Sequence, residues 1–183
     1  MYTEAVIVEG CRNNDPAFQK IVYEKYAPKM MTICMRYTGN YEEARDLLHD
    51  GFLKVFTNFN SYKQKSNLDS WISRVIINNV INNIRRKLKV EKAEKYFKKE
   101  FVLENTSSAE DSWMDNFSME EIHEAILGLS FEKRTVFNLY IVDKFSHKEI
   151  ARELGISEGA SKVSLYKARQ TLKELLMKKL NRG

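Results

Sequence analysis

Apolar residues recur every three or four positions through most of the chain, which is the spacing of helices that bury one face. No stretch of useful length alternates between apolar and polar residues, as a half-buried strand would. Asp15 followed by Pro16 has the residue types of a helix N-cap and a first helical position, and Gly39 is a natural stop. We therefore predict helices over about 16–39, 41–59 and 68–89, with the polar loop FNSYKQKSN before the last of them.

The second half of the chain predicts another group of helices behind a polar interruption. The segment ENTSSAEDS at 104–112 is small, polar and acidic, which is typical of a linker. Helices resume near Ser118, Ser130 can cap a further one, and Ser146 with Glu149 fits a capping box. We predict an all-α protein of two small helical domains, 1–95 and 118–183, joined by an acidic flexible linker over 96–117.

Residues 146–172, SHKEIARELGISEGASKVSLYKARQTL, have the pattern of a helix-turn-helix. Gly155 can take the positive φ of a sharp turn, and Ser157 can cap the helix that follows. Three apolar positions of that helix should face inward: Leu165, Ala168 and Leu172. The opposite stripe is basic and aromatic: Lys162, Tyr166, Arg169 and Lys173. Such a face suits a DNA major groove, although an amphipathic hairpin with a solvated basic face has the same pattern.

The predicted helix 41–59 has one apolar face and one acidic face. The apolar positions, expected in the core, are Leu48, Phe52, Val55 and Phe59. The opposite stripe is Asp46, Asp50, Leu53 and Thr57, with Glu43 and His49 beside it. An exposed leucine within an acidic rim suits docking onto a basic partner helix. A metal or hydrolytic site using these carboxylates and His49, and a plain solvated face, are the alternatives.

The predicted helix 68–89 combines isoleucines with asparagines and arginines. Its expected buried seam is Ile77, Ile81, Ile84 and Leu88. Its second stripe is Arg74, Asn78, Asn82, Arg85 and Lys89, flanked by Asn79, Asn83 and Arg86. Asparagine is a weak helix former, but its amide can donate to and accept from base edges and phosphates. The preceding loop places Tyr62, Lys63 and Lys65 near Trp71, which we expect in the core; this loop suits a single strand with an unstacked base.

Charge is distributed in three blocks, although the net charge is only +5. Residues 61–99 hold 11 Lys and Arg against 3 Asp and Glu, and residues 161–183 hold 7 against 1. Between them, residues 100–124 hold 8 acidic residues and no Lys or Arg. Two separate basic blocks suit a polyanion that is contacted in two places, and solvated helix faces would leave the same pattern.

Other compositional signals bound the location of the protein. No apolar run approaches the ~20 residues that span a bilayer, and MYTEAVIVEG lacks the pattern of a signal peptide. Cys11 and Cys34 are 23 positions apart with no CxxC spacing. We therefore expect reduced thiols in a cytoplasmic protein, and neither a disulfide framework nor a zinc site.

The end of the chain resembles region four of bacterial sigma factors. The resemblance is carried by Leu129, Arg134 and the runs EIA at 149–151, GIS at 155–157 and KAR at 167–169. The first half resembles region two of the same family. There the matching stretches are RDLLHDGFLKVF at 45–56 and WISR at 71–74, followed by Asn78 and Arg85-Arg86. With no room for a middle region, the chain is most similar to the two-domain extracytoplasmic function sigma factors.

The resemblance implies a sigma factor that binds core RNA polymerase and directs it to promoters, with no catalysis, cofactor, metal or small-molecule substrate. It implies polymerase contacts through Asp46, His49, Asp50 and Leu53. It implies minus-ten contacts through Tyr62, Lys63, Arg74, Asn78, Asn82, Arg85 and Arg86. It implies minus-thirty-five contacts through Lys162, Tyr166, Lys167 and Arg169. Relatives are commonly held inactive by an anti-sigma factor, which makes such a protein a further candidate partner.

The sequence departs from the family pattern at a few positions. Phe131 stands where proline is usual, and Asn82 stands where an acid is common. Ala160-Ser161 replaces Thr-Val and Ser164 replaces a frequent arginine. We expect all but Phe131 on the DNA-reading faces, so promoter preference cannot be transferred from relatives. Two other classes stay open: a dimeric helix-turn-helix regulator that acts without polymerase, and a small nucleic-acid enzyme that uses the acidic cluster.

Overall fold

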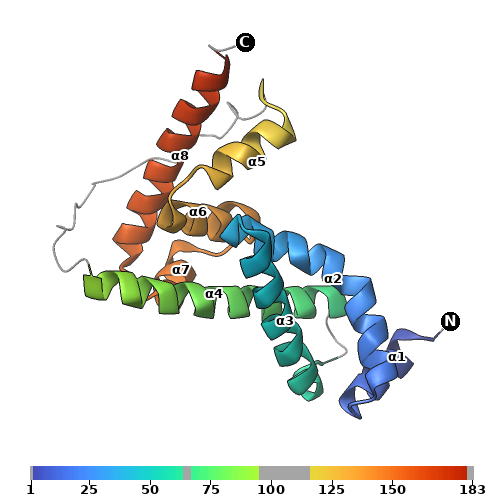
Figure 1. Cartoon of the computed structure of the whole chain (residues 1–183). Coiled ribbons are helices and arrows are strands. Elements are labelled where there is room, and N and C mark those ends of the chain that lie inside the picture. Colours follow the sequence, from blue (N-terminus) through green and yellow to red (C-terminus); the bar gives the residue numbers. More distant parts are fainter. Residues whose placement is uncertain (1, 64–66, 95–115, 181–183) are drawn as a thin grey trace. The chain divides into compact units, whose positions relative to one another are not determined.

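The computed structural model describes residues 2–63, 67–94 and 116–180, which are helices and short connections with no strand among them (Figure 1). The chain forms two compact units, Met1–Arg86 and Lys87–Gly183. The predicted all-α class with two helical domains is confirmed. The predicted linker at 96–117 lies outside the described residues except for its last two positions.

The first unit is built on five helical elements. They are α1 (Glu4–Arg12), α2 (Pro16–Thr38), α3 (Tyr41–Thr57), the 3-10 turn η1 (Phe59–Ser61) and α4 (Leu68–Glu94), which continues beyond the end of this unit at Arg86. A carboxylate oxygen of Asp15 accepts a hydrogen bond from the backbone N–H of Ala17 at 2.8 Å, which caps α2. Gly39 ends that helix in the left-handed conformation, with φ of 66°. Both ends of α2 are therefore where the sequence predicts them.

Helix α1 is an addition to the helices predicted from the sequence, the first of which begins after Asp15. The Thr3 side chain caps α1, and Glu4 lies in its first turn, where a negative charge is favourable. Val8 and Cys11 are fully buried on its inner face. The helix is therefore part of the folded unit.

The core of the first unit lies between α2, α3 and α4. The predicted apolar face of α3 is confirmed, because Leu48, Phe52, Val55 and Phe59 are all buried. Helix α2 contributes Val22, Tyr26, Met30, Ile33, Cys34 and Tyr37. The two cysteines are free, as predicted, and burial raises the pKa of Cys11 to about 11 and that of Cys34 to about 12. Both thiols therefore stay protonated and serve as small apolar groups.

Helix α4 is rotated relative to the predicted seam. Ile81 and Ile84 are buried as predicted, but Ile77 is only half-buried and the side chain of Leu88 lies outside the described residues. The positions that complete the buried face are Ile72, Ile76 and Val80. A Cβ on Gly51 of α3 would lie 2.5 Å from Cδ1 of Ile76, so a side chain at position 51 would require Ile76 to move.

Asn79 joins α3 to α4 and does not face DNA. The prediction that it flanks a nucleic-acid stripe is wrong, because only 4% of the residue is exposed. Its amide nitrogen donates to the carbonyl of Leu47 at 2.9 Å, and its amide oxygen accepts from Nζ of Lys54. A buried amide is tolerated when its polar atoms are paired in this way.

The adjacent pair Asn78 and Asn79 therefore tests the helix contact. We expect Asn79→Ala to lower the free energy of unfolding by about 1–3 kcal/mol, since it removes one buried and one partly buried hydrogen bond. The exposed neighbour is the matched control, and Asn78→Ala should change that free energy by less than about 0.5 kcal/mol. Urea unfolding followed by circular dichroism measures both. Equal effects of the two substitutions would contradict the assignment.

The second unit contains four α-helices and a π-helical turn among its described residues. They are α5 (Met119–Leu127), α6 (Phe131–Phe137), the π-helical turn η3 (Asn138–Val142), α7 (His147–Leu154) and α8 (Glu158–Leu180). Ser118 and Glu121 form a capping box at α5. Ser130 occupies the N-cap position of α6, but its side chain makes no capping bond, so that predicted cap is absent. Helix α8 packs against α5, α6 and α7 around a shared apolar core.

The helix-turn-helix has the predicted caps and turn. Ser146 and Glu149 form the capping box of α7, and Gly155 ends the helix with φ of 67°. The hydroxyl of Ser157 accepts from the backbone N–H of Ala160 at 3.0 Å and caps α8. The predicted inward residues of α8 are buried: Leu165, Ala168 and Leu172.

Candidate nucleic-acid interface

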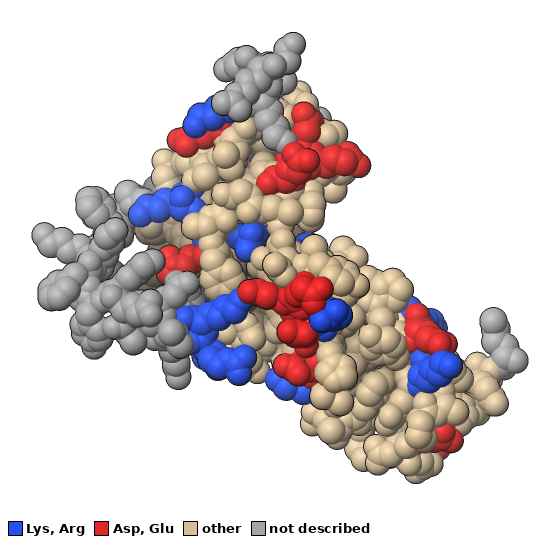
Figure 2. All heavy atoms as spheres, in the orientation of Figure 1, with Lys and Arg blue, Asp and Glu red and all other residues tan. Residues whose placement is uncertain are grey.

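Helix α3 presents an acidic face to solvent. All four residues of the candidate polymerase site are exposed: Asp46, His49, Asp50 and Leu53. We call these four residues the acidic face. Leu53 is 53% exposed and lies among these polar side chains. Figure 2 shows Asp and Glu side chains gathered over this helix. An exposed apolar residue with adjacent carboxylates offers both burial and charge to a basic partner.

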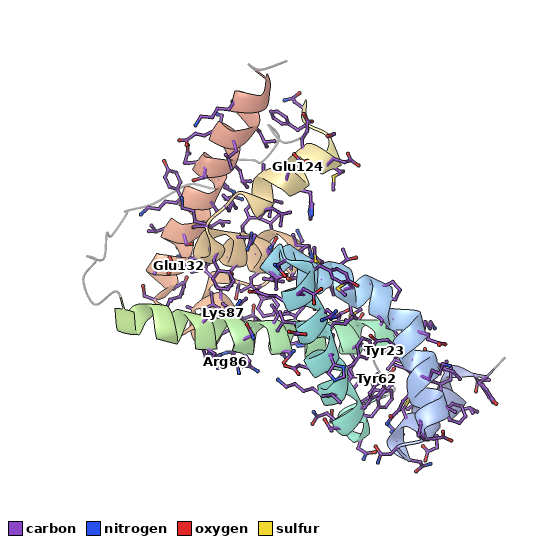
Figure 3. All side chains as sticks on the ribbon, viewed as in Figure 1. Tyr23, Tyr62, Arg86, Lys87, Glu124 and Glu132 are labelled. Atoms are coloured by element: carbon purple, nitrogen blue, oxygen red, sulfur yellow. The ribbon has the colours of Figure 1, made fainter. Side chains whose placement is uncertain are left out.

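Helix α4 presents a second polar surface in the same unit. Arg74, Asn78, Asn82 and Arg86 are exposed, and Arg85 is half-buried. We call these five residues the α4 face; Figure 3 labels Arg86, whose side chain projects outward from the helix. From Arg74 to Arg86 the face extends roughly 18 Å along the helix.

The loop between α3 and α4 differs from its prediction at one residue. Lys63 is exposed, as a phosphate contact requires, but Tyr62 is only 1% exposed. The ring of Tyr62 packs against Phe59 and Trp71, with centroids 6.3 and 5.3 Å away. Tyr62 is therefore part of the core, and its ring is not available to stack on a base. Trp71 is half-buried in this aromatic cluster, and Lys65 lies outside the described residues.

Helix α8 carries the third candidate surface, in the second unit. Lys162, Tyr166 and Lys167 are exposed and Arg169 is half-buried; we call these four the α8 face. Nζ of Lys162 lies 3.1 Å from a carboxylate oxygen of Glu158, one turn earlier. Such an exposed ion pair contributes little to stability, so Lys162 can exchange it for a phosphate at small cost.

Ser161 does not lie on the DNA-reading surface, contrary to its prediction. It is fully buried, and its hydroxyl oxygen lies 2.9 Å from Nδ1 of His147. The ring of His147 stacks on Tyr140, with centroids 4.4 Å apart. These contacts join the π-helical turn, the start of α7 and the first turns of α8. They hold the start of α8 against α7 and the π-helical turn.

His147 is held in its neutral form by this packing. Burial is the main cause that lowers its pKa, and the positive charge of Lys162 adds to it. Glu158 acts in the opposite direction, and Arg169 lowers the pKa further. Because the pKa is lower in the folded protein than in the unfolded chain, the unfolded chain binds more protons, and stability rises with pH.

We predict that acid destabilises the helix-turn-helix through His147. The stability that the neutral His147 ring contributes to the folded protein is fully present above the ordinary histidine pKa of about 6.5, and it is lost as the pH falls below that value. The melting temperature of wild type should therefore fall more between about pH 7.5 and about pH 5.5 than that of His147→Gln. The exposed His123 supplies the control, since His123→Gln should follow wild type. A His147→Gln curve parallel to wild type would contradict the prediction.

No metal centre is found in the part of the chain that the structure describes. There, no group of three or more His, Cys, Asp or Glu side chains could hold an ion. The alternative of a metal site among Glu43, Asp46, His49 and Asp50 therefore has no supporting geometry. Across the described residues, each helix is either too short or too polar to cross a bilayer.

Several residues that support these surfaces were not identified from the sequence. Lys54 is one, because its pairing with Asn79 depends on a contact between two helices. Glu4 and Arg12 are others, because they lie in the unpredicted helix α1 and reach Tyr62. The N-cap Thr3, the acid after it and the spacing of Val8 and Cys11 were available signals for α1.

Two family models match the chain over most of these elements. A model of sigma-70 region 2 matches residues 22–90, and a model of sigma-70 region 4 matches residues 119–172. The acidic face and the α4 face lie within the first match, and the α8 face lies within the second. Helix α1 lies before both.

Two curated relatives from one species match along nearly their whole length. The ECF RNA polymerase sigma factor SigW of Bacillus subtilis is 27% identical over 176 residues, covering 90% of this chain and 91% of that protein. The RNA polymerase sigma factor YlaC of the same species is 26% identical over 158 residues, covering 86% and 91%. The sigma factor RpoE of Bartonella quintana, solved with the anti-sigma factor NepR, superposes with a TM-score of 0.50 at 21% identity. That match covers 86% of this chain and 96% of RpoE and supports the fold.

Proposed function

The chain belongs to the sigma-70 family, as a sigma factor of the extracytoplasmic function type, and we propose that its three polar surfaces divide polymerase binding and promoter recognition between them. A sigma factor binds core RNA polymerase and directs it to promoters. The observation that carries the division is the exposure of all three surfaces within the matched regions. A stand-alone helix-turn-helix regulator would leave the region 2 match without a role.

The acidic face of α3 is the proposed polymerase contact. Leu53 supplies apolar area that is free to be buried, and Asp50 and Asp46 lie one and two turns before it, respectively, on the same stripe. A central apolar anchor with a charged rim is the usual composition of a binding hot spot. The carboxylates would select a basic helix and steer its approach, and Leu53 would provide most of the contact energy.

The α4 face, with Lys63 beside it, is the proposed site for the minus-ten element. Arg74, Asn78 and Asn82 lie on one exposed stripe, so a strand that follows the helix meets amides and guanidinium groups in turn. Amides can bond the edges of unpaired bases, and arginines neutralise phosphates. Tyr62 is left out of this site because its ring is buried.

The α8 face is the proposed reader of the minus-thirty-five element. Its exposed residues lie in the first half of the recognition helix, which is the part that enters a major groove. Lys162 and Lys167 can neutralise phosphates, Arg169 can bond a guanine edge, and Tyr166 offers apolar contact. The buried contact between Ser161 and His147 holds this helix in place.

Each DNA site is small, so we propose that promoter binding requires polymerase to hold both. Two weak sites on one body gain affinity through effective concentration, whereas free protein should bind duplex DNA poorly. We also propose that this chain makes and breaks no bonds, since RNA synthesis belongs to the polymerase. Its place of action is then the cytoplasm, and an anti-sigma factor, as in the RpoE–NepR structure, is a further proposed partner.

Variants of the two DNA sites should lose different promoter elements. A promoter is first selected from a random-sequence library by holoenzyme reconstituted with wild type. We expect Asn78→Ala/Asn82→Ala to weaken the binding of holoenzyme to the single-stranded minus-ten segment of that promoter by about tenfold or more. We expect Tyr166→Ala/Lys167→Ala to weaken the binding of holoenzyme to the duplex minus-thirty-five segment by about tenfold or more.

Fluorescence anisotropy of labelled DNA measures both affinities. Lys20→Ala, which removes an exposed lysine from α2, is the control and should leave both unchanged. Polymerase binding should also be unchanged in every variant. A variant that loses the element assigned to the other site, or loses neither, would contradict the division.

A further inference from the structure

Helix α1 has no role in the proposed function so far, yet it is tightly built into the first unit. It precedes the region 2 match, which begins at residue 22. A Cβ on Gly10 would lie 2.1 Å from the ring of Phe18, so any larger residue at position 10 would have to displace that ring. Val8 and Cys11 are fully buried beneath it. The position of α1 on α2 is therefore closely specified.

Both ends of α1 hold the same residue of the loop between α3 and α4. At the C-terminal end, Nη2 of Arg12 donates to the backbone carbonyl of Tyr62 at 2.8 Å. At the N-terminal end, the hydroxyl of Tyr62 donates to a carboxylate oxygen of Glu4 at 3.3 Å. Glu4 and Arg12 are about 12 Å apart along the helix. Tyr62 is thus fixed by its backbone and by its side chain, through contacts 50 and 58 residues apart in sequence.

The side chain of Tyr62 is well suited to this anchoring. Its ring is buried and packs against the rings of Phe59 and Trp71, inside the first unit (Figure 3). Burial, followed by the nearby Glu4 carboxylate, raises the pKa of Tyr62, so its hydroxyl stays protonated and can donate. The guanidinium of Arg12 gives a charge-assisted bond to the carbonyl, which is stronger than a neutral one.

Tyr62 lies immediately before Lys63, a candidate contact for the melted DNA strand. Lys63 follows Tyr62 and is exposed. On the other side of the loop, the side chain of Asn67 accepts from the backbone N–H of Asp69 at 2.8 Å, at the start of α4. Binding a melted strand orders flexible groups at a cost in affinity, and groups that are already ordered avoid part of that cost.

We propose that α1 is a positioning element for the non-template strand of the minus-ten region. Arg12 and Glu4 are positioning residues that act through Tyr62, and they hold Lys63 where it meets the strand beside the α4 face. This role deepens the proposed function and rests on it. It assigns a use to α1, and it explains why a tyrosine expected to touch DNA is buried.

The test compares Arg12 variants in reconstituted holoenzyme. The probe is the single-stranded minus-ten segment of a promoter that wild-type holoenzyme selects from a random-sequence library. We expect Arg12→Ala to weaken binding of this strand by about three- to tenfold, with affinity for core polymerase and for duplex minus-thirty-five DNA unchanged. Arg12→Lys should restore most of the loss, since an ammonium can also donate to the Tyr62 carbonyl.

A second variant keeps the test decisive if Arg12→Ala folds poorly. Tyr62→Phe keeps the buried ring and removes only the bond to Glu4, so it should weaken strand binding without loss of polymerase binding. Strand binding equal to wild type in both variants would overturn the proposal. A loss of polymerase binding in parallel with strand binding would overturn it too, since that indicates general destabilisation.

Failure of the proposed function looks different. In that case the wild-type protein itself binds no core polymerase or selects no promoter. If wild type binds polymerase and selects a promoter, and the Arg12 and Tyr62 variants bind the minus-ten strand as tightly as wild type does, then the sigma function stands and the proposed role of α1 is wrong.

Discussion

The close packing of α3 on α4 determines what either helix can present to a partner. Gly51 lets Ile76 reach the backbone of α3, and Asn79 pairs with Leu47 and Lys54 across the contact. This contact sets the rotation of both helices about their axes. The rotation of α3 turns Asp46 and Asp50 toward solvent, and the rotation of α4 turns Asn78 and Asn82 toward solvent. The proposed polymerase site and minus-ten site are thus two consequences of one helix contact.

In the second unit, a polar contact helps to set which face of α8 is exposed. Its recognition helix must expose Lys162, Tyr166 and Lys167 and yet be held at a fixed angle to α7. Gly155 supplies the turn, and the contact between the buried Ser161 and the half-buried His147 ties the start of α8 to the start of α7. In each unit the helix that carries a proposed DNA contact is held by a buried polar residue with a partner, Asn79 in the first and Ser161 in the second.

The pattern of α3 could be predicted because its apolar residues, apart from the exposed Leu53, lie on one face. In α4, isoleucine or valine stands at 76, 77, 80 and 81, so two neighbouring stripes are almost equally apolar and the rotation is ambiguous. The choice is made by Gly51 and Lys54 on another helix, and no local pattern contains that information. The predictions for Tyr62 and Ser161 failed for the same reason. Each residue is polar and would be expected at the surface from its local sequence, and each is buried by residues distant in the sequence.

The family assignment, by contrast, depends on short motifs that are visible in the amino-acid sequence. The EIA, GIS and RDLLHD runs are enough to predict the caps, the turn and the acidic face. The departures from the family pattern need the fold for their interpretation. Ser161 serves the hairpin interior, whereas Asn82 is exposed on the α4 face, where it can affect promoter preference.

The most direct test of the account is the affinity of bacterial core RNA polymerase for this protein, wild type against Asp46→Ala/Asp50→Ala. Glu24→Ala/Glu132→Ala, which removes two exposed acids outside α3, is the matched control. The account predicts stable binding by wild type and by the control, and a loss of about tenfold or more in the α3 variant. A folded wild-type protein that does not bind core polymerase would contradict the sigma function. An α3 variant that binds as wild type does would contradict the acidic face as its site.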